Sequence, residues 1–179
     1  TQSWISSFPG TPTTIVRAGN VIGGGDVSKD RLMPDLISAY LNNQVPTLRY
    51  PNSVRPWQHV LDCLNGYLMV SESLIAGAEH PMMNIGPDKE SFVTVAKVAE
   101  LVAKQLSVEP TWNLSDSSEP HEAGLLSLDA SLAKEKLGWH DRLKFNDAVT
   151  WTTDWYQKVE AKEIARDVTL MQIKDFLNL

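Results

Sequence analysis

The chain has 179 residues, of which 42% are hydrophobic and 21% are charged, as expected for a globular domain with a sizeable core. Its formal net charge of −6 and the lack of a basic run argue against a nucleic-acid-binding protein. A lone cysteine, Cys63, and the lack of an apolar run long enough to cross a bilayer favour a cytoplasmic protein without membrane contact.

The first fifty residues predict short strands and one helix. Residues 1–8 carry no signal-peptide pattern, and we expect them to be the end of an amphipathic helix. The β-branched run at 13–18 predicts a buried strand. Residues 19–26 predict a loop, because glycine and asparagine tolerate positive φ. A helix is predicted at 33–43, with Pro34 in its first turn.

Strands and helices continue to alternate through the rest of the chain. Further strands are predicted at 46–49, 58–60, 82–85, 111–114 and 125–128. Further helices are predicted at 61–76, 94–106, 129–138, 145–159 and 168–177. This alternation predicts an α/β fold, with too few strands for a complete doubly wound sheet.

Three consecutive glycines follow the first predicted strand, at 23–25. They lack the spacing of the dinucleotide-binding fingerprint and the acidic residue that follows it roughly 20 positions later. A flexible turn is therefore the preferred interpretation of the glycines alone. Ligands of open α/β sheets nevertheless bind beyond the carboxyl ends of strands, so this position favours a nearby site.

The segment 54–62 concentrates Arg55, Trp57, His59 and Asp62 within eight positions. The planar guanidinium of Arg55 suits a pyrophosphate, and a structural role is equally compatible with it. For Trp57 we favour a place in the core, and for Asp62 a helix cap. The histidines of the chain are too widely separated for a zinc site, so no metal site is predicted. The sequence has no Ser-His-Asp pattern, Gly-x-Ser-x-Gly or Cys-x-x-Cys motif, and no catalytic residue is predicted either.

Several strings in order resemble one enzyme family. The strings are 17–26 (Arg-Ala-Gly-Asn-Val-Ile-Gly-Gly-Gly-Asp), 30–35 (Asp-Arg-Leu-Met-Pro-Asp) and 54–62 (Val-Arg-Pro-Trp-Gln-His-Val-Leu-Asp). Shorter matches follow at 83–86, 120–123, 128–131, 137–139 and 149–156. Together they resemble CDP-glucose 4,6-dehydratase, an extended short-chain dehydrogenase/reductase of the epimerase/dehydratase group.

The resemblance implies the C-terminal part of a Rossmann-like fold, with a small mixed α/β substrate-binding lobe and an incomplete parallel sheet. Enzymes of this family use NAD to convert CDP-glucose into the 4-keto-6-deoxy sugar. Their Tyr-x-x-x-Lys pair and NAD-binding half precede the portion that these 179 residues resemble, and none of the four tyrosines has a lysine four positions later. We therefore expect residues 1–179 to be inactive alone and not to bind NAD stably.

The resemblance also implies a set of ligand-binding residues. The positions matching the family's substrate site are Asn20, Arg31, Leu32, Arg49, Arg55, Asn84 and His121. Asn20 and Val21 match positions beside the cofactor. The chain departs from the family at Gly124 and Leu125, where His-Tyr is usual, and at Ser127, where lysine is usual. These changes fall at the nucleotide end of the implied site.

Three interpretations remain open from the sequence. The chain is part of a CDP-glucose 4,6-dehydratase, or a non-catalytic nucleotide-sugar binding module, or part of a related dTDP-, UDP- or GDP-sugar dehydratase or epimerase. In each case the expected partner is a nucleotide sugar, with no nucleic acid and no membrane. We expect the full-length enzyme to be a homo-oligomer, and the isolated chain to associate through the strand at 14–18 because one edge of that strand is open.

Overall fold

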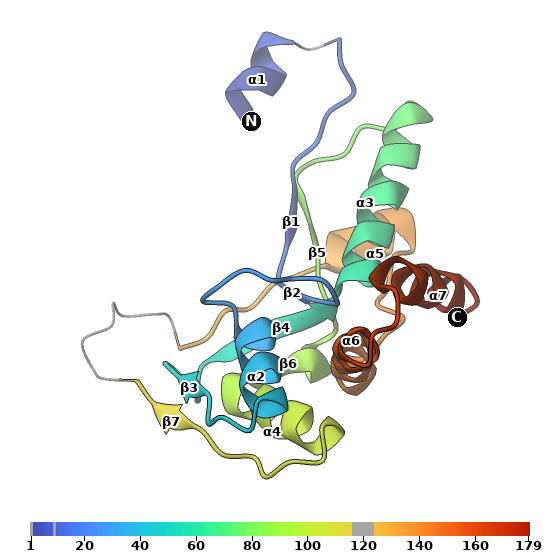
Figure 1. Ribbon diagram of the computed structural model, residues 1–179. Helices are drawn as coiled ribbons and strands as arrows, with labels where there is room; N and C mark the ends of the chain where they lie inside the picture. Colours follow the sequence, from blue (N-terminus) through green and yellow to red (C-terminus); the bar gives the residue numbers. More distant parts are fainter. Residues whose placement is uncertain (1, 9, 116–123) are drawn as a thin grey trace.

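The computed structural model describes residues 2–8, 10–115 and 124–179 (Figure 1). Its elements in chain order are α1 (Gln2–Ser7), β1 (Val16–Ala18), β2 (Asn20–Ile22), α2 (Leu32–Leu41), β3 (Thr47–Leu48), β4 (Val54–His59), α3 (Val60–Ile75), β5 (Met83–Ile85), η1 (Lys89–Ser91), β6 (Phe92–Thr94), α4 (Val95–Gln105), β7 (Asn113–Leu114), α5 (Ser131–Leu137), α6 (Phe145–Glu160) and α7 (Ala165–Leu177).

The strands pair in three short ladders within the described part of the chain. β1 pairs in parallel with β5, and Val16 lies opposite Met83. β2 pairs in parallel with β4, which in turn pairs antiparallel with β6. β3 and β7 form another parallel pair. The predicted α/β class with an incomplete parallel sheet is confirmed.

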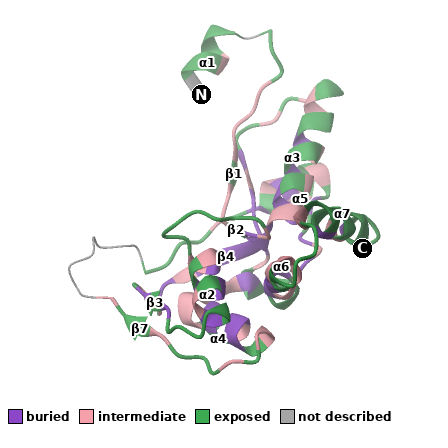
Figure 2. Ribbon diagram, in the orientation of Figure 1, coloured by how far each residue is buried: buried purple, intermediate pink, exposed green. Residues whose placement is uncertain are grey.

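Buried apolar side chains form two clusters. The larger cluster joins α2, α4 and α6 to the β2–β4 ladder and includes Leu36, Ile37, Trp57, Val98, Val102 and Val149. The smaller one joins α3 and α5 to β5 and includes Val70, Met83, Ile85, Ala133 and Trp139. Figure 2 shows β4 and β5 buried at these two centres, whereas α1 lies exposed at one end of the molecule.

The helices agree with the sequence-based predictions because their caps and apolar periods are local signals. α4 begins where the Thr94 hydroxyl accepts the backbone N–H of Lys97 at 3.2 Å. α5 begins where the Asp129 carboxylate accepts the N–H of Ser131 at 2.9 Å. It ends at Gly138, whose φ of +65° is the left-handed conformation that glycine adopts at little cost.

The strands differ more from their predictions. The predicted strand at 13–18 is limited to β1, and the predicted loop at 19–26 begins with β2, because residues 20–22 pair with β4. β6 was not predicted, and it forms because Phe92–Thr94 lies opposite Val54–Pro56. The strand expected at 125–128 is reduced to a single bridge between Leu125 and Val54.

Candidate functional site

A cleft of about 830 Å³ opens between the segment after β2, the start of α2, and strands β3 and β4. β2 and β4 run in parallel, and the glycine-rich segment 23–26 leaves the sheet at the carboxyl end of β2. This is the position where open α/β sheets bind ligands, since the loops there are free to form walls.

The cleft brings together most of the predicted ligand-binding residues. The lining includes six of them, Asn20, Val21, Arg31, Leu32, Arg49 and Arg55. They come from β2, the start of α2, the residue after β3, and β4, so the fold gathers segments as far apart as residues 20 and 55. Three arginines among the lining residues form a setting suited to a phosphate-bearing ligand.

Arg55 is the most deeply placed of these arginines, with only 5% of its surface exposed. Its Nη1 donates a hydrogen bond to the Val54 carbonyl at 2.8 Å, which fixes the guanidinium at the cleft wall. The guanidinium group carries a positive charge and offers five N–H donors in a planar fork. The cleft therefore holds a positive charge whose position is determined by strand β4.

Carboxylates share the cleft, and sequence reasoning did not assign them to it. Asp26, Asp30 and Asp35 all line the cleft. Burial, with Asp30 as a further cause, raises the pKa of Asp35, while nearby Arg49 opposes this rise. Hydrogen bonds from Ser28 lower the pKa of Asp26. In the sequence they are visible only as acidic residues on both sides of the predicted helix start. They become part of the cleft wall only when the chain folds.

Two of the predicted ligand residues are not placed in the cleft. Asn84 lies on β5, outside the lining, and its side-chain amide donates to the Asp129 carbonyl at 2.9 Å. In this position it holds the start of α5. His121 lies outside the described residues, as do positions 116–123 generally. The predicted hydrogen-bond donors that line the cleft therefore all come from residues 20–55.

The segment 54–62 serves the fold as well as the cleft. Trp57 is buried, as expected, and its Nε1 donates to the Val93 carbonyl at 3.1 Å, although its ring also reaches the lining. The helix-cap assignment of Asp62 was wrong. His59 is the N-cap of α3 and accepts the N–H of Leu61, whereas Asp62 accepts the N–H groups of Arg142 and Leu143 at 2.7 and 3.1 Å.

Packing, rather than a phosphate cradle, explains Gly23 and Gly24, whereas Gly25 adopts a φ of +85°. A Cβ on Gly23 would lie 2.4 Å from Val60 Cγ1, and a Cβ on Gly24 would lie 2.1 Å from Trp155 Cγ. The interpretation as a flexible turn is thereby corrected to a closely packed one. Since the sequence also lacks the spaced glycines of a dinucleotide fingerprint, the described residues fit a whole NAD poorly, and no chemical step is assigned to them.

Neither a metal centre nor a membrane span is found in the part of the chain that the structure describes. There, no group of three or more His, Cys, Asp or Glu side chains lies close enough to hold a metal ion. Across the same residues, none of the helices has the length and apolar content needed to pass through a bilayer.

Comparison with known proteins finds sugar-nucleotide enzymes that are similar to this chain. Residues 1–86 match the model of the NAD dependent epimerase/dehydratase family. The CDP-glucose 4,6-dehydratase of Salmonella typhimurium is 38% identical over 165 residues, which cover 91% of this chain and 46% of that protein. A trifunctional UDP-glucose 4,6-dehydratase, epimerase and reductase of Arabidopsis thaliana is 28% identical over 149 residues, covering 82% and 21% respectively.

Solved structures share the fold at low sequence identity. The UDP-glucuronic acid 4-epimerase of Bacillus cereus, in complex with UDP-glucuronic acid and NAD, superposes with a TM-score of 0.77 at 19% identity, over 88% of this chain and 49% of that one. The dTDP-glucose 4,6-dehydratase of Bacillus anthracis, in complex with NAD, gives 0.73 at 20% identity, over 87% and 47%.

The chain spans less than half the length of the curated relatives it matches. Within that span, the sequence similarity and the fold similarity both indicate sugar-nucleotide dehydratases and epimerases. The chain is thus similar over residues 1–86 to the NAD dependent epimerase/dehydratase family, and over most of its length to a CDP-glucose 4,6-dehydratase.

Proposed function

We propose that this chain is the nucleotide-sugar binding portion of a CDP-glucose 4,6-dehydratase, the NAD-dependent lyase that converts CDP-glucose to CDP-4-keto-6-deoxyglucose. The single observation that carries the proposal is the gathering of Arg31, Arg49 and Arg55 with Asn20 in one cleft. A nucleotide sugar presents two phosphate charges, and guanidinium groups bind phosphate oxygens through two parallel hydrogen bonds. The 38% identity with the Salmonella enzyme favours CDP over other nucleotides.

In this proposal the chain binds and orients the substrate and does not carry the reaction. NAD would supply the hydride-transfer chemistry of the reaction. Asn20 and Val21 would lie beside it, and its main contacts would come from residues outside this chain. None of the four tyrosines is followed by lysine at the fourth position, so we expect the 179 residues alone to be inactive. We further propose a cytoplasmic, homo-oligomeric full-length enzyme, the compartment following from the lone Cys63.

Calorimetric titration of the chain with CDP-glucose tests the proposal, using a matched pair of variants. Arg31→Ala removes a cation that lines the cleft, whereas Lys29→Ala removes a cation two positions away that does not line it. A charge-assisted hydrogen bond contributes about 1.5–3 kcal/mol, so Arg31→Ala should weaken binding about tenfold or more. Lys29→Ala should leave the dissociation constant nearly unchanged. The lack of a heat signal at millimolar CDP-glucose would contradict the proposal.

Parallel titrations with UDP-, dTDP- and GDP-glucose separate the alternatives. Tighter binding of another nucleotide sugar would assign the chain to a related dehydratase or epimerase. A non-catalytic binding module would bind CDP-glucose equally well, and a longer protein that contains this chain would then form no 4-keto product. Product formation by that longer protein supports the dehydratase.

A further inference from the structure

The glycine-rich segment after β2 forms one wall of the cleft, and helix α6 lies behind that wall. Gly23, Gly24 and Asp26 line the cleft. Two aromatic residues of α6, Trp155 and Tyr156, contact the same segment but are not part of the lining. The wall therefore has an inner side toward the cleft and an outer side that rests on α6, which is about 130 residues later in the chain.

Trp155 supports the outer side at Gly24. A Cβ built on Gly24 would lie 2.1 Å from Trp155 Cγ and 2.2 Å from its Cδ2, so the indole ring lies directly against the glycine backbone. The ring is itself held in place, because its Nε1 donates to the Thr169 hydroxyl at 2.8 Å. Thr169 in turn donates to the Ala165 carbonyl at 2.8 Å, which connects the wall through Trp155 to α7.

Tyr156 supports the wall two residues further on. Its hydroxyl donates to the Asp26 carbonyl at 2.6 Å. The rings of Trp155 and Tyr156 meet edge to face, with centroids 5.2 Å apart. Burial raises the pKa of Tyr156 to about 12, so the hydroxyl keeps its proton and remains a donor at neutral pH.

The backbone of residues 23–26, which forms the wall, has little conformational preference of its own. Three of its residues are glycines, and Gly25 adopts a φ of +85°. Glycine loses more conformational freedom on ordering than any other residue, so an unsupported segment of this kind would have to be ordered by the ligand itself. A segment ordered in advance spares the ligand that cost and binds it more tightly.

We infer that Trp155 and Tyr156 are positioning residues, which hold residues 23–26 against α6 so that the cleft wall is formed before the ligand binds. The identity of the ligand, a nucleotide sugar, rests on the proposed function. The ordering of the wall does not, and it is measurable in the ligand-free chain. Residues of α6 and α7 that never touch the ligand thereby influence its affinity.

Two variants of the 179-residue chain test the inference. Tyr156→Phe removes only the hydroxyl, and Trp155→Ala removes the ring behind Gly24. Amide hydrogen exchange without ligand should become faster in segment 19–28 and stay unchanged in α4. The dissociation constant of CDP-glucose should rise about tenfold for Trp155→Ala, and less for Tyr156→Phe. Tyr67→Phe on α3 and Trp4→Ala on α1 are matched controls, with no change expected in either measurement.

A second pair of variants tests whether the contact between Trp155 and Gly24 orders the wall. Gly24→Ala places a methyl group within the indole ring and should disturb segment 19–28 strongly in the wild-type background. In the Trp155→Ala background the ring is gone, so the added effect of Gly24→Ala should be much smaller. Equal effects in both backgrounds would overturn the inference, as would unchanged exchange in Tyr156→Phe and Trp155→Ala.

The two hypotheses fail in different ways. If the unaltered chain binds no nucleotide sugar, the proposed function is refuted, and faster exchange in the variants still shows that α6 orders the wall. If the unaltered chain binds CDP-glucose and both variants bind it with wild-type affinity, the positioning role is refuted and the proposed function stands.

Discussion

Arg55, Trp57, His59 and Asp62 stand close together in the sequence and serve four different purposes. Arg55 places a charge at the cleft, and Trp57 packs in the larger core. His59 starts helix α3, and Asp62 holds the backbone at residues 142–143. Arg55, Trp57 and His59 lie on one face of β4 at different points along its length, and Asp62 belongs to the helix that follows, so neighbours in the sequence reach different surroundings.

His59 gives the protein a defined pH dependence. Its ring is 1% exposed, and Nδ1 accepts the N–H of Leu61 at 3.3 Å, which places the proton on Nε2. Among the described residues, Nε2 has no hydrogen-bond partner. Burial lowers the pKa of His59 to about 4, so the folded state favours the neutral ring. Its contribution to stability is present above pH 6.5 and is lost as the pH falls toward 4.

We predict that His59 lowers the free energy of unfolding by about 3 kcal/mol between pH 7 and pH 4, because its pKa is about 4 in the folded protein and 6.5 in the unfolded chain. Asp62 acts in the opposite direction, because burial raises its pKa to about 6 and its protonation on acidification favours the folded state. The experiment is therefore to compare the free energies of unfolding of wild type and His59→Gln at pH 7 and pH 4. The difference between the two proteins should change by about 3 kcal/mol between these pH values. A difference that is constant with pH would contradict it, and Asp62→Asn should show the reverse trend.

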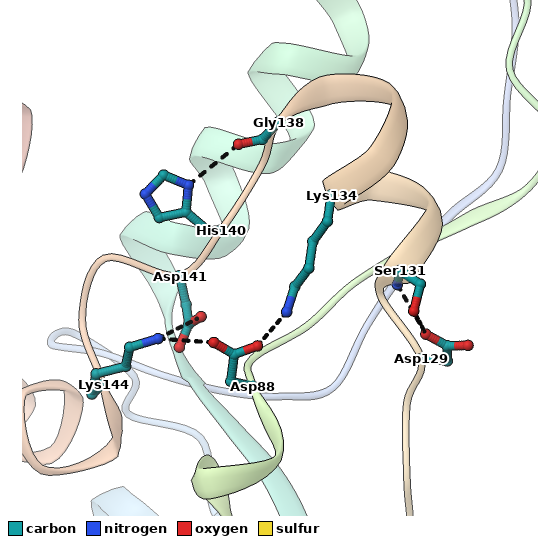
Figure 3. A network of polar contacts seen from close by, with 8 residues as sticks. All are labelled: Asp88, Asp129, Ser131, Lys134, Gly138, His140, Asp141 and Lys144. Atoms are coloured by element: carbon teal, nitrogen blue, oxygen red, sulfur yellow. Dashed lines mark hydrogen bonds and ion pairs between the residues drawn. The ribbon is translucent and has the colours of Figure 1, made fainter.

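At the scale of elements, one carboxylate joins the end of β5 to two later segments (Figure 3). Asp88 forms an ion pair with Lys134 of α5 and another with Lys144, which precedes α6, at 3.0 Å. Lys144 also reaches Asp141 at 3.2 Å. These hydrogen bonds, first that of Lys134, lower the pKa of Asp88, so the network is intact at neutral pH.

We predict that Asp88→Asn lowers the unfolding free energy by about 1 kcal/mol at low salt, because the three side chains are partly exposed and solvent screens their attraction. The effect should shrink in 1 M salt, where the Debye length is about 3 Å. Urea unfolding at both salt concentrations measures it. Glu100→Gln, which breaks an exposed pair with Lys97 within α4, is the control and should cost less. A salt-independent loss would indicate packing rather than charge.

Helices were easier to predict than strands for a physical reason. The period of α4 and the glycine that ends α5 are properties of contiguous residues. A strand needs a partner, and β6 and β2 have theirs in β4, far away in the sequence. Three residues of β-branched or polar character carry too little information to show which distant segment they will meet.

At the scale of the whole molecule, the ladder of β1 and β5 has an open edge. Within the described residues, β1 pairs with β5 and with no further strand. The Ile15 carbonyl accepts the N–H of Met83, so the backbone groups of Val16 point to the other side. Unpaired edges of this kind favour pairing with another chain.

We therefore predict that the isolated chain self-associates, with a sedimentation coefficient that rises with concentration. Val16→Pro removes an outward N–H without removing a bond to β5, and it should reduce association by several-fold. Val45→Pro, in the exposed loop before β3, is the matched control and should associate like wild type. A monomeric mass that is independent of concentration in the unaltered chain would contradict the prediction.

The α/β class, the helices and the family resemblance could be predicted from the sequence, because caps, periodicity and motif strings are properties of consecutive residues. It also identified six residues that share the cleft, by resemblance and not by geometry. The folded structure was needed to show that Asn84 holds α5, that three aspartates line the cleft, and that Trp155 and Tyr156 contact the glycine-rich wall. Such contacts join segments up to 130 residues apart, and their geometry exists only once the chain has folded.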